Sequence, residues 1–509
     1  MSLSFPTMAA IRFGYGLRPG ENPPQTKDDL IGQVTRGADI VPGFPVGGIE
    51  ARHTQILDLQ DRLRQIRQAD GDDLARRQQR RLLQRRAQVL FQMDANARLM
   101  QSVLSPYGFN ERLATFWTNH FSTSAAKSLP MRLIVPLYEA EAIRPYMGGK
   151  FSTLLRSATE HPSMLIYLDQ AQSLGPDSKG GMRRNKGLNE NLGRELLELH
   201  TLGAGSGYTQ ADVRSAAMVL TGLTIDPQEM ETAFRPQISE PGKHEVLGIS
   251  YGGAKRTRKD YLAMLDDLAA NPKTAEHISR KLAVHFISDQ PPQEMIAAMS
   301  EAWKKTDGEL SAVYRAMLDH PAAWRDDGAK ARQPFDYIVA GLRALNSGSG
   351  AGDVAAFMQA YQGDDADSDE MMTMQPKKQD GAPDGQAMMQ APPSPDDEAR
   401  IKRRKAFQMA RAIGQGALRR MGQPTWLPSS PAGFEESFSA WITASQLSER
   451  LAWARRASAQ FGRDVDPREF LKATLADAAR DETIRVVSQA PSRASGLTLV
   501  LASPEFNRR

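Results

Sequence analysis

Residues 189–200 read Asn189-Glu190-Asn191-Leu192-Gly193-Arg194-Glu195-Leu196-Leu197-Glu198-Leu199-His200. On a helix that turns about 100° per residue, the three glutamates, the arginine and one asparagine of this run share an arc of about 140°. The leucines lie mainly on the opposite side, so the pattern predicts a helix with one apolar face and one polar face. His200 falls opposite the glutamates in the last turn, and Gly203 and Gly205 are expected to end the helix.

The composition predicts a mostly α fold. Aromatic residues make up only 7% of the chain, and Ala, Leu, Arg, Gln and Met, which favour helix, recur throughout. Only residues 224–255 alternate short extended pieces with Pro and Gly, and there we expect a minor β-hairpin element. The expected architecture is therefore an irregular multi-helix assembly. Cysteine is absent, which excludes disulfides, thiolate metal sites and a cysteine nucleophile.

The length of 509 residues exceeds what one ordinary core accommodates, so several packed units are expected. Residues 1–347 are predicted to form a helical N-terminal part that carries the candidate site. Residues 348–400 are rich in Asp, Met and Pro, a composition that predicts a disordered insert. Residues 401–509 are predicted to form a C-terminal helical part that packs on the first.

Basic residues are unevenly distributed along the chain. The formal net charge is +4, and nine arginines fall between Arg62 and Arg86. One interpretation is a patch for nucleic acid or another anionic surface. The favoured interpretation is a solvated helix face, because no aromatic residue offers bases a stacking platform and an apolar side is supplied by Leu74, Leu82, Leu83, Val89 and Leu90. We therefore predict no nucleic-acid partner.

Neither a membrane span nor a signal peptide is visible in the sequence. No run approaches about 18 apolar residues, so no transmembrane segment is predicted. Residues 1–20 lack a basic n-region and a long apolar h-region, which makes the cytoplasm the default compartment.

A second predicted helix, residues 111–122, offers an imidazole that can face the glutamates. Leu113, Phe116, Trp117 and Phe121 share one arc of this helix, and His120 falls in the middle of it. Such a histidine points inward, either as a core residue or as a site residue. The predicted catalytic residues are His120, Glu190, Arg194, Glu195 and Glu198, and the predicted ligand-binding residues are Asn119, Asn189, Asn191, His161 and Asp169.

Two roles fit these side chains. In the first, His120, Glu195 and Glu198 hold a divalent metal ion, a remaining glutamate acts as general base on water, and Arg194 orients an anionic group. In the second, they form a structural network with Arg194 held between Glu190 and Glu198 at i,i+4 spacing. Three carboxylates against one arginine leave surplus negative charge, which in a buried group needs a proton, a cation or a second base. The sequence leaves both roles open.

Several motifs along the chain together resemble one bacterial family. They are Phe116-Trp117-Thr118-Asn119-His120-Phe121, His161-Pro162-Ser163-Met164-Leu165, the run from Asn189 to Gly203, Gly207-Tyr208-Thr209-Gln210-Ala211-Asp212-Val213, Leu220-Thr221-Gly222 and Ala502-Ser503-Pro504-Glu505-Phe506. The chain resembles the family catalogued as domain of unknown function 1800 over nearly its whole length, except residues 348–400. The family name carries no established reaction.

Members of that family are often exported and often encoded beside an alkaline-phosphatase-like protein. Two function hypotheses follow. One is a metal-assisted hydrolase that acts on envelope material, and the other is a non-catalytic scaffold or accessory protein that docks the alkaline-phosphatase-like partner. The resemblance also makes a periplasmic or exported location the alternative to the cytoplasm. The sequence departs from the family at Thr118, where relatives often have a second histidine, and this departure counts against a metal site built on two neighbouring histidines.

Overall fold

The computed structural model describes residues 3–69, 73–184, 187–325, 328, 330–346, 353–358 and 395–509. These residues are mostly helical, with two small antiparallel sheets of two strands each, so the predicted fold class is confirmed. Within these ranges, none of the helices combines the length and the apolar character that a membrane crossing requires.

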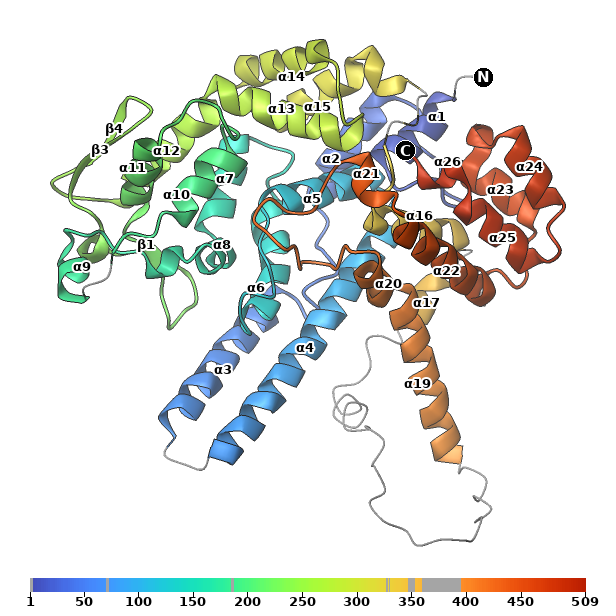
Figure 1. Cartoon of the computed structure of the whole chain (residues 1–509), viewed down its shortest axis with the longest axis horizontal. Helices are drawn as coiled ribbons and strands as arrows, with labels where there is room; N and C mark the ends of the chain where they lie inside the picture. Colours follow the sequence, from blue (N-terminus) through green and yellow to red (C-terminus); the bar gives the residue numbers. More distant parts are fainter. Residues whose placement is uncertain are drawn as a thin grey trace, which may run out of the picture.

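The chain up to residue 346 forms the larger share of the molecule and is drawn from blue to yellow in Figure 1. Its elements are α1 (Phe5–Met8), η1 (Ala9–Phe13), α2 (Lys27–Ala38), α3 (Ile49–Gln68), α4 (Asp73–Leu104), α5 (Gly108–His120), α6 (Met131–Tyr138), η2 (Glu139–Ile143), α7 (Phe151–Glu160), α8 (Pro162–Tyr167), η3 (Gln170–Gln172), α9 (Lys179–Arg184), α10 (Asn191–Glu195), η4 (Leu196–His200), α11 (Gln210–Leu220), β1 (Leu223–Ile225), β2 (Thr232–Phe234), η5 (Pro236–Ile238), β3 (Gly242–Val246), β4 (Ile249–Gly253), α12 (Arg258–Ala270), α13 (Pro272–Phe286), α14 (Gln293–Thr306), α15 (Leu310–Asp319), η6 (Pro321–Trp324) and α16 (Pro334–Leu345).

The rest of the chain adds a further group of helices, drawn in orange and red. They are α17 (Val354–Met358), α19 (Pro395–Ile413), α20 (Gln415–Arg420), α21 (Phe438–Trp441), α22 (Ala444–Phe461), α23 (Pro467–Leu475), η9 (Ala476–Ala478), α24 (Asp481–Ser488), α25 (Arg493–Ala502) and α26 (Pro504–Asn507). Two of these helices overlap the predicted insert, since α17 and the first turn and a half of α19 fall within residues 348–400. The remainder of that predicted segment lies outside the described residues.

Three hydrophobic cores hold the helices together. The largest packs α5 against α7, α8 and α10–α15, and the apolar stripe predicted for residues 111–122 is fully buried in it. The second joins α16 to α20, α22, α23 and α25, so α16 packs with the C-terminal helices although it precedes the predicted insert. The third joins α3, α4 and α6 and includes Trp426.

The minor β element lies where the sequence predicts it. β1 pairs with β2 in the register Leu223↔Phe234, and β3 pairs with β4 through Val246↔Ile249. The second pair is a hairpin whose two turn residues, Leu247 and Gly248, have φ values of 52° and 81°. Positive φ at both turn positions matches the right-handed twist of the flanking strands.

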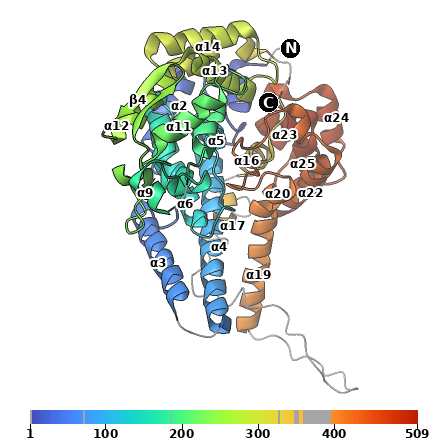
Figure 2. The same cartoon turned by 60° about the vertical axis from the view of Figure 1, so that its left-hand side comes forward.

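Helices α3 and α4 form a long antiparallel hairpin that extends away from the body, and α19 extends from the same side (Figures 1 and 2). Close to the body, Leu83 and Leu90 of α4 are each only 9% exposed. Leu74 and Leu82 are 61% and 55% exposed, so the prediction that they belong to a buried side of the helix is wrong. For Leu82 the cause is helical spacing, because it is rotated by about 100° from its buried neighbour Leu83.

Candidate functional site

The predicted helix of residues 189–200 forms in two pieces. It is α-helical in α10 and π-helical in η4, where backbone hydrogen bonds reach five residues back, as from Leu202 N to Leu197 O (3.1 Å). Thr201 Oγ1 donates to Leu196 O (2.7 Å), which satisfies a carbonyl at the irregular turn. The wider π turn changes the angular spacing between residues, and short π segments are frequent at functional sites.

The polar face of α10 and η4 carries a surface ion-pair network at its N-terminal end. Glu190 lies 3.5 Å from Arg194 and 3.7 Å from Arg214. Gln210 Nε2 donates to Glu190 Oε2 (2.8 Å), and Arg194 Nη2 donates to Gln210 Oε1 (3.0 Å). The charge of Glu190 is thus balanced by two arginines. The sequence predicts that Arg194 is held between Glu190 and Glu198. Of these two contacts, the structure shows the one with Glu190.

Glu195 and Glu198, one turn further on, have a different environment. Both are half-buried, and neither forms an ion pair with any described residue. Burial raises the pKa of Glu195, and the charge of Glu198 raises it further against the opposing charge of Arg194. Glu198 is hydrogen-bonded to Tyr208, whose own pKa is raised by burial and by the Glu198 carboxylate. The two neighbouring carboxyl groups and their partial burial thus make the charged form of Glu195 less favourable than that of an ordinary glutamate.

Two tyrosines interact with the carboxyl groups. Tyr167, at the end of α8, has a pKa raised by burial and by the charge of Glu195. Tyr208, ahead of α11, donates a hydrogen bond to Glu198. Each acid therefore interacts with the hydroxyl group of one tyrosine.

A shallow hollow of about 790 Å³ adjoins this face. The predicted site residues Asn189, Glu190 and Asn191 line it with Gln172, Gly187 and Leu188. Asn189 Oδ1 accepts the backbone N–H of Asn191 (2.9 Å), which fixes the bend that leads into α10. The hollow therefore presents amide and carboxylate groups beside the acid pair.

His120 does not belong to this face. Its ring packs among Phe116, Trp117 and Phe121, and its Nε2–H donates to His200 O (3.3 Å). Nδ1 is buried and has no hydrogen-bond partner among the described residues. Burial lowers the pKa of His120 well below its ordinary value, so the ring is neutral. It is a core histidine, one of the two alternatives that the sequence leaves open.

The metal centre predicted from His120, Glu195 and Glu198 is not assembled. In the part of the chain that the structure describes, no group of three or more His, Asp or Glu side chains is placed to hold a metal ion. The leucines of α10 and η4 and the ring of His200 are buried, whereas Glu195 and Glu198 lie half-buried on the other side of the helix and His120 lies in the core.

The three remaining predicted ligand-binding residues also have partners elsewhere. His161 Nδ1 accepts the backbone N–H of Ser163 (3.1 Å) and so caps α8, while its Nε2 lies 3.3 Å from Glu141 Oε2. Asp169 pairs with Lys127 (2.7 Å). Asn119 forms two hydrogen bonds, of 3.0 and 2.7 Å, with the backbone of Phe434. These side chains hold separate segments together and do not meet at the acid pair.

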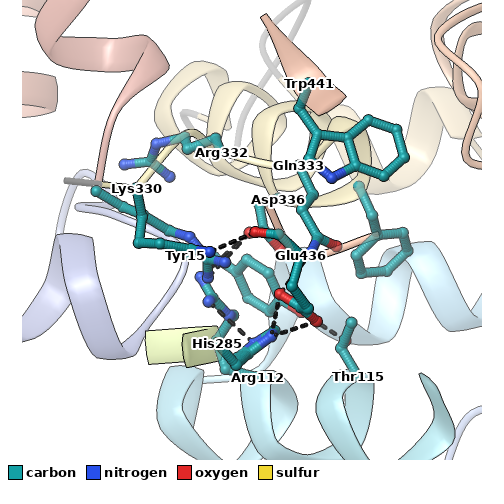
Figure 3. Close-up of polar contacts among 12 residues, drawn as sticks. Tyr15, Arg112, Thr115, His285, Lys330, Arg332, Gln333, Asp336, Glu436 and Trp441 are labelled. Atoms are coloured by element: carbon teal, nitrogen blue, oxygen red, sulfur yellow. Dashed lines mark hydrogen bonds and ion pairs between the residues drawn. The ribbon is translucent and has the colours of Figure 1, made fainter. Parts of the chain in front are cut away.

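The structure also contains a second, buried polar centre that the sequence does not reveal (Figure 3). Glu436 accepts from His285 Nδ1 at 2.9 and 3.0 Å with its two oxygens, and Arg112 Nη2 donates to His285 Nε2 (3.2 Å). Arg112 also lies 3.4 Å from Asp336, whose other ion-pair partner is Arg509 (3.1 Å). Burial raises the pKa of Glu436, but the hydrogen bond from His285 and the charges of Lys330 and Arg112 outweigh it, so the pKa is lowered.

This buried network joins segments from both ends of the chain. Arg112 lies on α5 and His285 on α13, whereas Asp336 lies on α16 and Glu436 in the loop before α21. A pocket of about 520 Å³ lies between α5 and that loop, with His285, Glu436 and Thr118 in its lining. Helical or strand periodicity cannot predict contacts between residues so far apart in sequence. The sequence indicates only that Arg112 lies on the polar side of its helix.

The network joins segments from the two ends of the chain, and its side chains are occupied by contacts with one another. Because Arg112 donates to His285 Nε2, the imidazole keeps its proton on Nδ1 and cannot act as a base without losing that contact.

Comparison with known proteins gives one result. The sequence profile of the family described as "Protein of unknown function (DUF1800)" matches residues 9–508. No curated protein and no solved structure shows a significant match. The match spans nearly all of the chain, and the chain belongs to this family of proteins of unknown function.

Proposed function

We propose that the protein is a hydrolase of envelope material whose reacting groups are the carboxyl groups of Glu195 and Glu198. The observation that carries the proposal is the difference between the two acids. Glu195 holds a proton more firmly than an ordinary glutamate, and Glu198 accepts a hydrogen bond from Tyr208. A carboxyl group that holds its proton more firmly than usual is suited to act as an acid, and a neighbouring carboxyl group that accepts hydrogen bonds is suited to act as a base.

Glycosidic bonds are the substrate class that this arrangement fits best. Their hydrolysis needs one carboxylic acid to protonate the leaving oxygen and one carboxylate to activate water. Tyr167 and Tyr208 offer faces for sugar rings, and the amides of Asn189 and Gln172 in the adjoining hollow offer partners for hydroxyl groups. The openness of this face suits a polymer better than a small molecule.

The proposed reaction is written with these two groups. Glu195 donates its proton to the glycosidic oxygen as the bond from that oxygen to the anomeric carbon breaks. Glu198 takes a proton from water as the water oxygen bonds to the same carbon. The products are two shorter sugars, and proton exchange with solvent returns both carboxyl groups to their starting states. Arg194 lowers the pKa of Glu195 only in part, which keeps the proton transferable.

The test uses the purified full-length protein with isolated cell-wall sacculi and envelope polysaccharides. New reducing ends are measured for the wild type and for Glu195→Gln, Glu198→Gln and the control Glu294→Gln, which alters an exposed acid on α14. We expect each site variant to lose about a hundredfold or more of the activity and the control to keep it.

Equal activity in all four proteins overturns the proposal. So does a wild type that releases no new ends from any of these polymers. In that case the accessory function is the remaining hypothesis, and co-purification with the alkaline-phosphatase-like protein encoded nearby is its direct measurement.

A further inference from the structure

The α3–α4 hairpin carries an unusual surplus of unpaired positive charge. Residues 58–86 contain nine arginines and five aspartates. Four of the arginines pair with an aspartate of the hairpin, as Arg62 does with Asp58 (2.8 Å) and Arg76 with Asp73 (2.6 Å). The other five have no ion-pair partner among the described residues and are exposed, namely Arg67, Arg77, Arg80, Arg81 and Arg85.

The unpaired arginines are interleaved with exposed leucines on α4. Leu74, Arg77, Arg81 and Arg85 follow one another at intervals of three and four residues, so they lie along one face of the helix. Leu82 adds a second apolar side chain with 55% of its surface exposed. Isolated exposed leucines are common in proteins, but two among four guanidinium groups form an amphipathic surface.

The position of this surface sets it apart from an ordinary solvated helix face. α3 and α4 extend from the body on the same side as α19, and the two views agree on this (Figures 1 and 2). The described and exposed residues of α19 include Lys402 and Lys405. Three helices thus bring basic side chains to one side of the molecule, where an extended surface can meet all of them at once.

Two features decide what kind of anionic partner fits. Residues 58–86 contain no Phe, Tyr or Trp, so nucleic-acid bases find nothing to stack on. A lipid bilayer with anionic headgroups offers phosphates to the arginines and, just below them, an apolar layer for Leu74 and Leu82. Projecting helix ends with a mixed basic and apolar surface match such an interface better than they match the grooved surface of a folded protein.

We propose that the described part of the α3–α4 hairpin within residues 62–69 and 73–86 binds the surface of a membrane that contains anionic phospholipids. The arginines contact headgroup phosphates, and Leu74 and Leu82 enter the boundary between headgroups and acyl chains. The binding holds the body at the bilayer without any spanning segment. It is independent of the hydrolase proposal, because Glu195 and Glu198 lie on another part of the molecule.

Vesicle flotation with the full-length protein tests the electrostatic part. We expect the protein to float with vesicles that contain phosphatidylglycerol in phosphatidylcholine and to stay behind with phosphatidylcholine alone. Added salt should weaken the binding, because exposed charges are screened. The variant Arg77→Glu/Arg80→Glu/Arg81→Glu should lose about a hundredfold or more of the partition coefficient, since each basic side chain near an anionic surface contributes substantially.

A matched control carries the same change of charge elsewhere. Arg463→Glu/Lys472→Glu/Arg485→Glu alters three exposed basic residues among the C-terminal helices, away from the hairpin. It should bind nearly as well as the wild type. Equal loss in both triple variants, with both folded by circular dichroism, overturns the assignment to the hairpin.

A fluorescence measurement tests the insertion of the leucines separately. Leu82→Trp places a fluorophore at the proposed insertion site, and its emission should shift to the blue on adding phosphatidylglycerol vesicles but not on adding DNA or polyglutamate. Binding to DNA or polyglutamate with no binding to vesicles overturns the proposal in favour of another anionic polymer. Vesicle binding with no blue shift overturns the insertion of the leucines.

Discussion

Arg112 Nη2 lies 3.2 Å from His285 Nε2, while both oxygens of Glu436 lie within 3.0 Å of the opposite ring nitrogen. The imidazole is therefore held on both sides, by a guanidinium group from α5 and by a carboxylate from the loop before α21. Arg112 and His285 are at most 1% exposed. Removing one member of such a buried set leaves the others with charges that water cannot reach.

The first prediction concerns this network. Glu436→Gln should lower the free energy of unfolding by about 3 kcal/mol, because it removes a negative charge from an interior in which Arg112 and Arg509 then share the carboxylate of Asp336. Urea unfolding followed by circular dichroism measures it. The control is Glu435→Gln, which alters the preceding exposed glutamate and should change stability by less than about 0.5 kcal/mol. Similar losses for both substitutions contradict the assigned role of Glu436.

The second prediction follows from the raised pKa of Glu195. A carboxyl group whose pKa is higher in the folded state than in the unfolded state contributes stability at low pH, and this contribution is lost as pH rises through the folded-state pKa. The Glu195→Gln substitution removes the group whose ionisation causes this loss of stability. The variant should therefore have a Tm equal to or above that of the wild type at neutral pH, and the advantage should vanish in acid. Thermal unfolding across pH measures it, with Glu294→Gln as control. A lower Tm at neutral pH contradicts the prediction.

The raised pKa of Glu195 also predicts a pH dependence of the proposed hydrolysis. Activity needs Glu195 protonated, so the rate should fall as pH rises through its pKa. In Glu195→Gln this fall on the alkaline side should disappear together with most of the rate. An unchanged alkaline limb in the residual activity of that variant shows that another group sets it.

The third prediction concerns three buried imidazoles. Burial lowers the pKa of His200 to about 3 and of His277 to about 4, and that of His120 is also lowered. Histidines with lowered pKa contribute stability above their unfolded value of 6.5, and it is lost as pH falls. Stability should therefore decline from about pH 6.5 towards pH 4, with a slope of up to about 1.4 kcal/mol per pH unit for each histidine.

The variant His200→Phe isolates one of these contributions. Its stability should decline less steeply with acid than that of the wild type, by about one proton. Urea unfolding at several pH values gives both slopes. If the stability of both proteins declines equally steeply with falling pH, groups other than His200 cause the loss of stability in acid.

The fourth prediction tests how α10 is positioned. A Cβ atom on Gly193 would lie 2.9 Å from Ala217 N and 3.0 Å from Val213 O, both backbone atoms of α11. Gly193→Ala should force the helices apart, cost about 1–3 kcal/mol and reduce the proposed activity by displacing Glu195. The matched control is Gly187→Ala, where nothing lies within 4 Å of the added atom. Full stability of Gly193→Ala means that the two helices do not pack this closely.

Most of the helical architecture follows from local patterns in the sequence. The buried stripe of α5 forms as predicted, and a capping box forms between Thr209 and Asp212, three residues apart at the start of α11. These features depend on neighbouring residues alone, so the sequence carries them. The insertion of α16 into the C-terminal core could not be inferred, because its apolar residues would suit either core.

The candidate site was predicted less completely. Helical spacing predicts three features of the site: the glutamates lie on the outer face, His200 points inward, and Glu190 pairs with Arg194. The position of His120 relative to Glu195 depends on how α5 meets η4, and an inward-pointing ring is compatible with both core and site. The buried network of Arg112, His285 and Glu436 depends on contacts across 173 and 151 residues, which no local pattern encodes.

The network around His285 also limits how the chain can be divided. A fragment that stops before residue 395 keeps Arg112, His285 and Asp336 but lacks Glu436 and Arg509, so His285 loses its carboxylate partner and Asp336 loses one of its two cations. The C-terminal segment thus supplies both an acid and a base to the interior of the N-terminal one, as well as packing on it. During synthesis, these buried polar contacts can form only after residues 436 and 509 have left the ribosome.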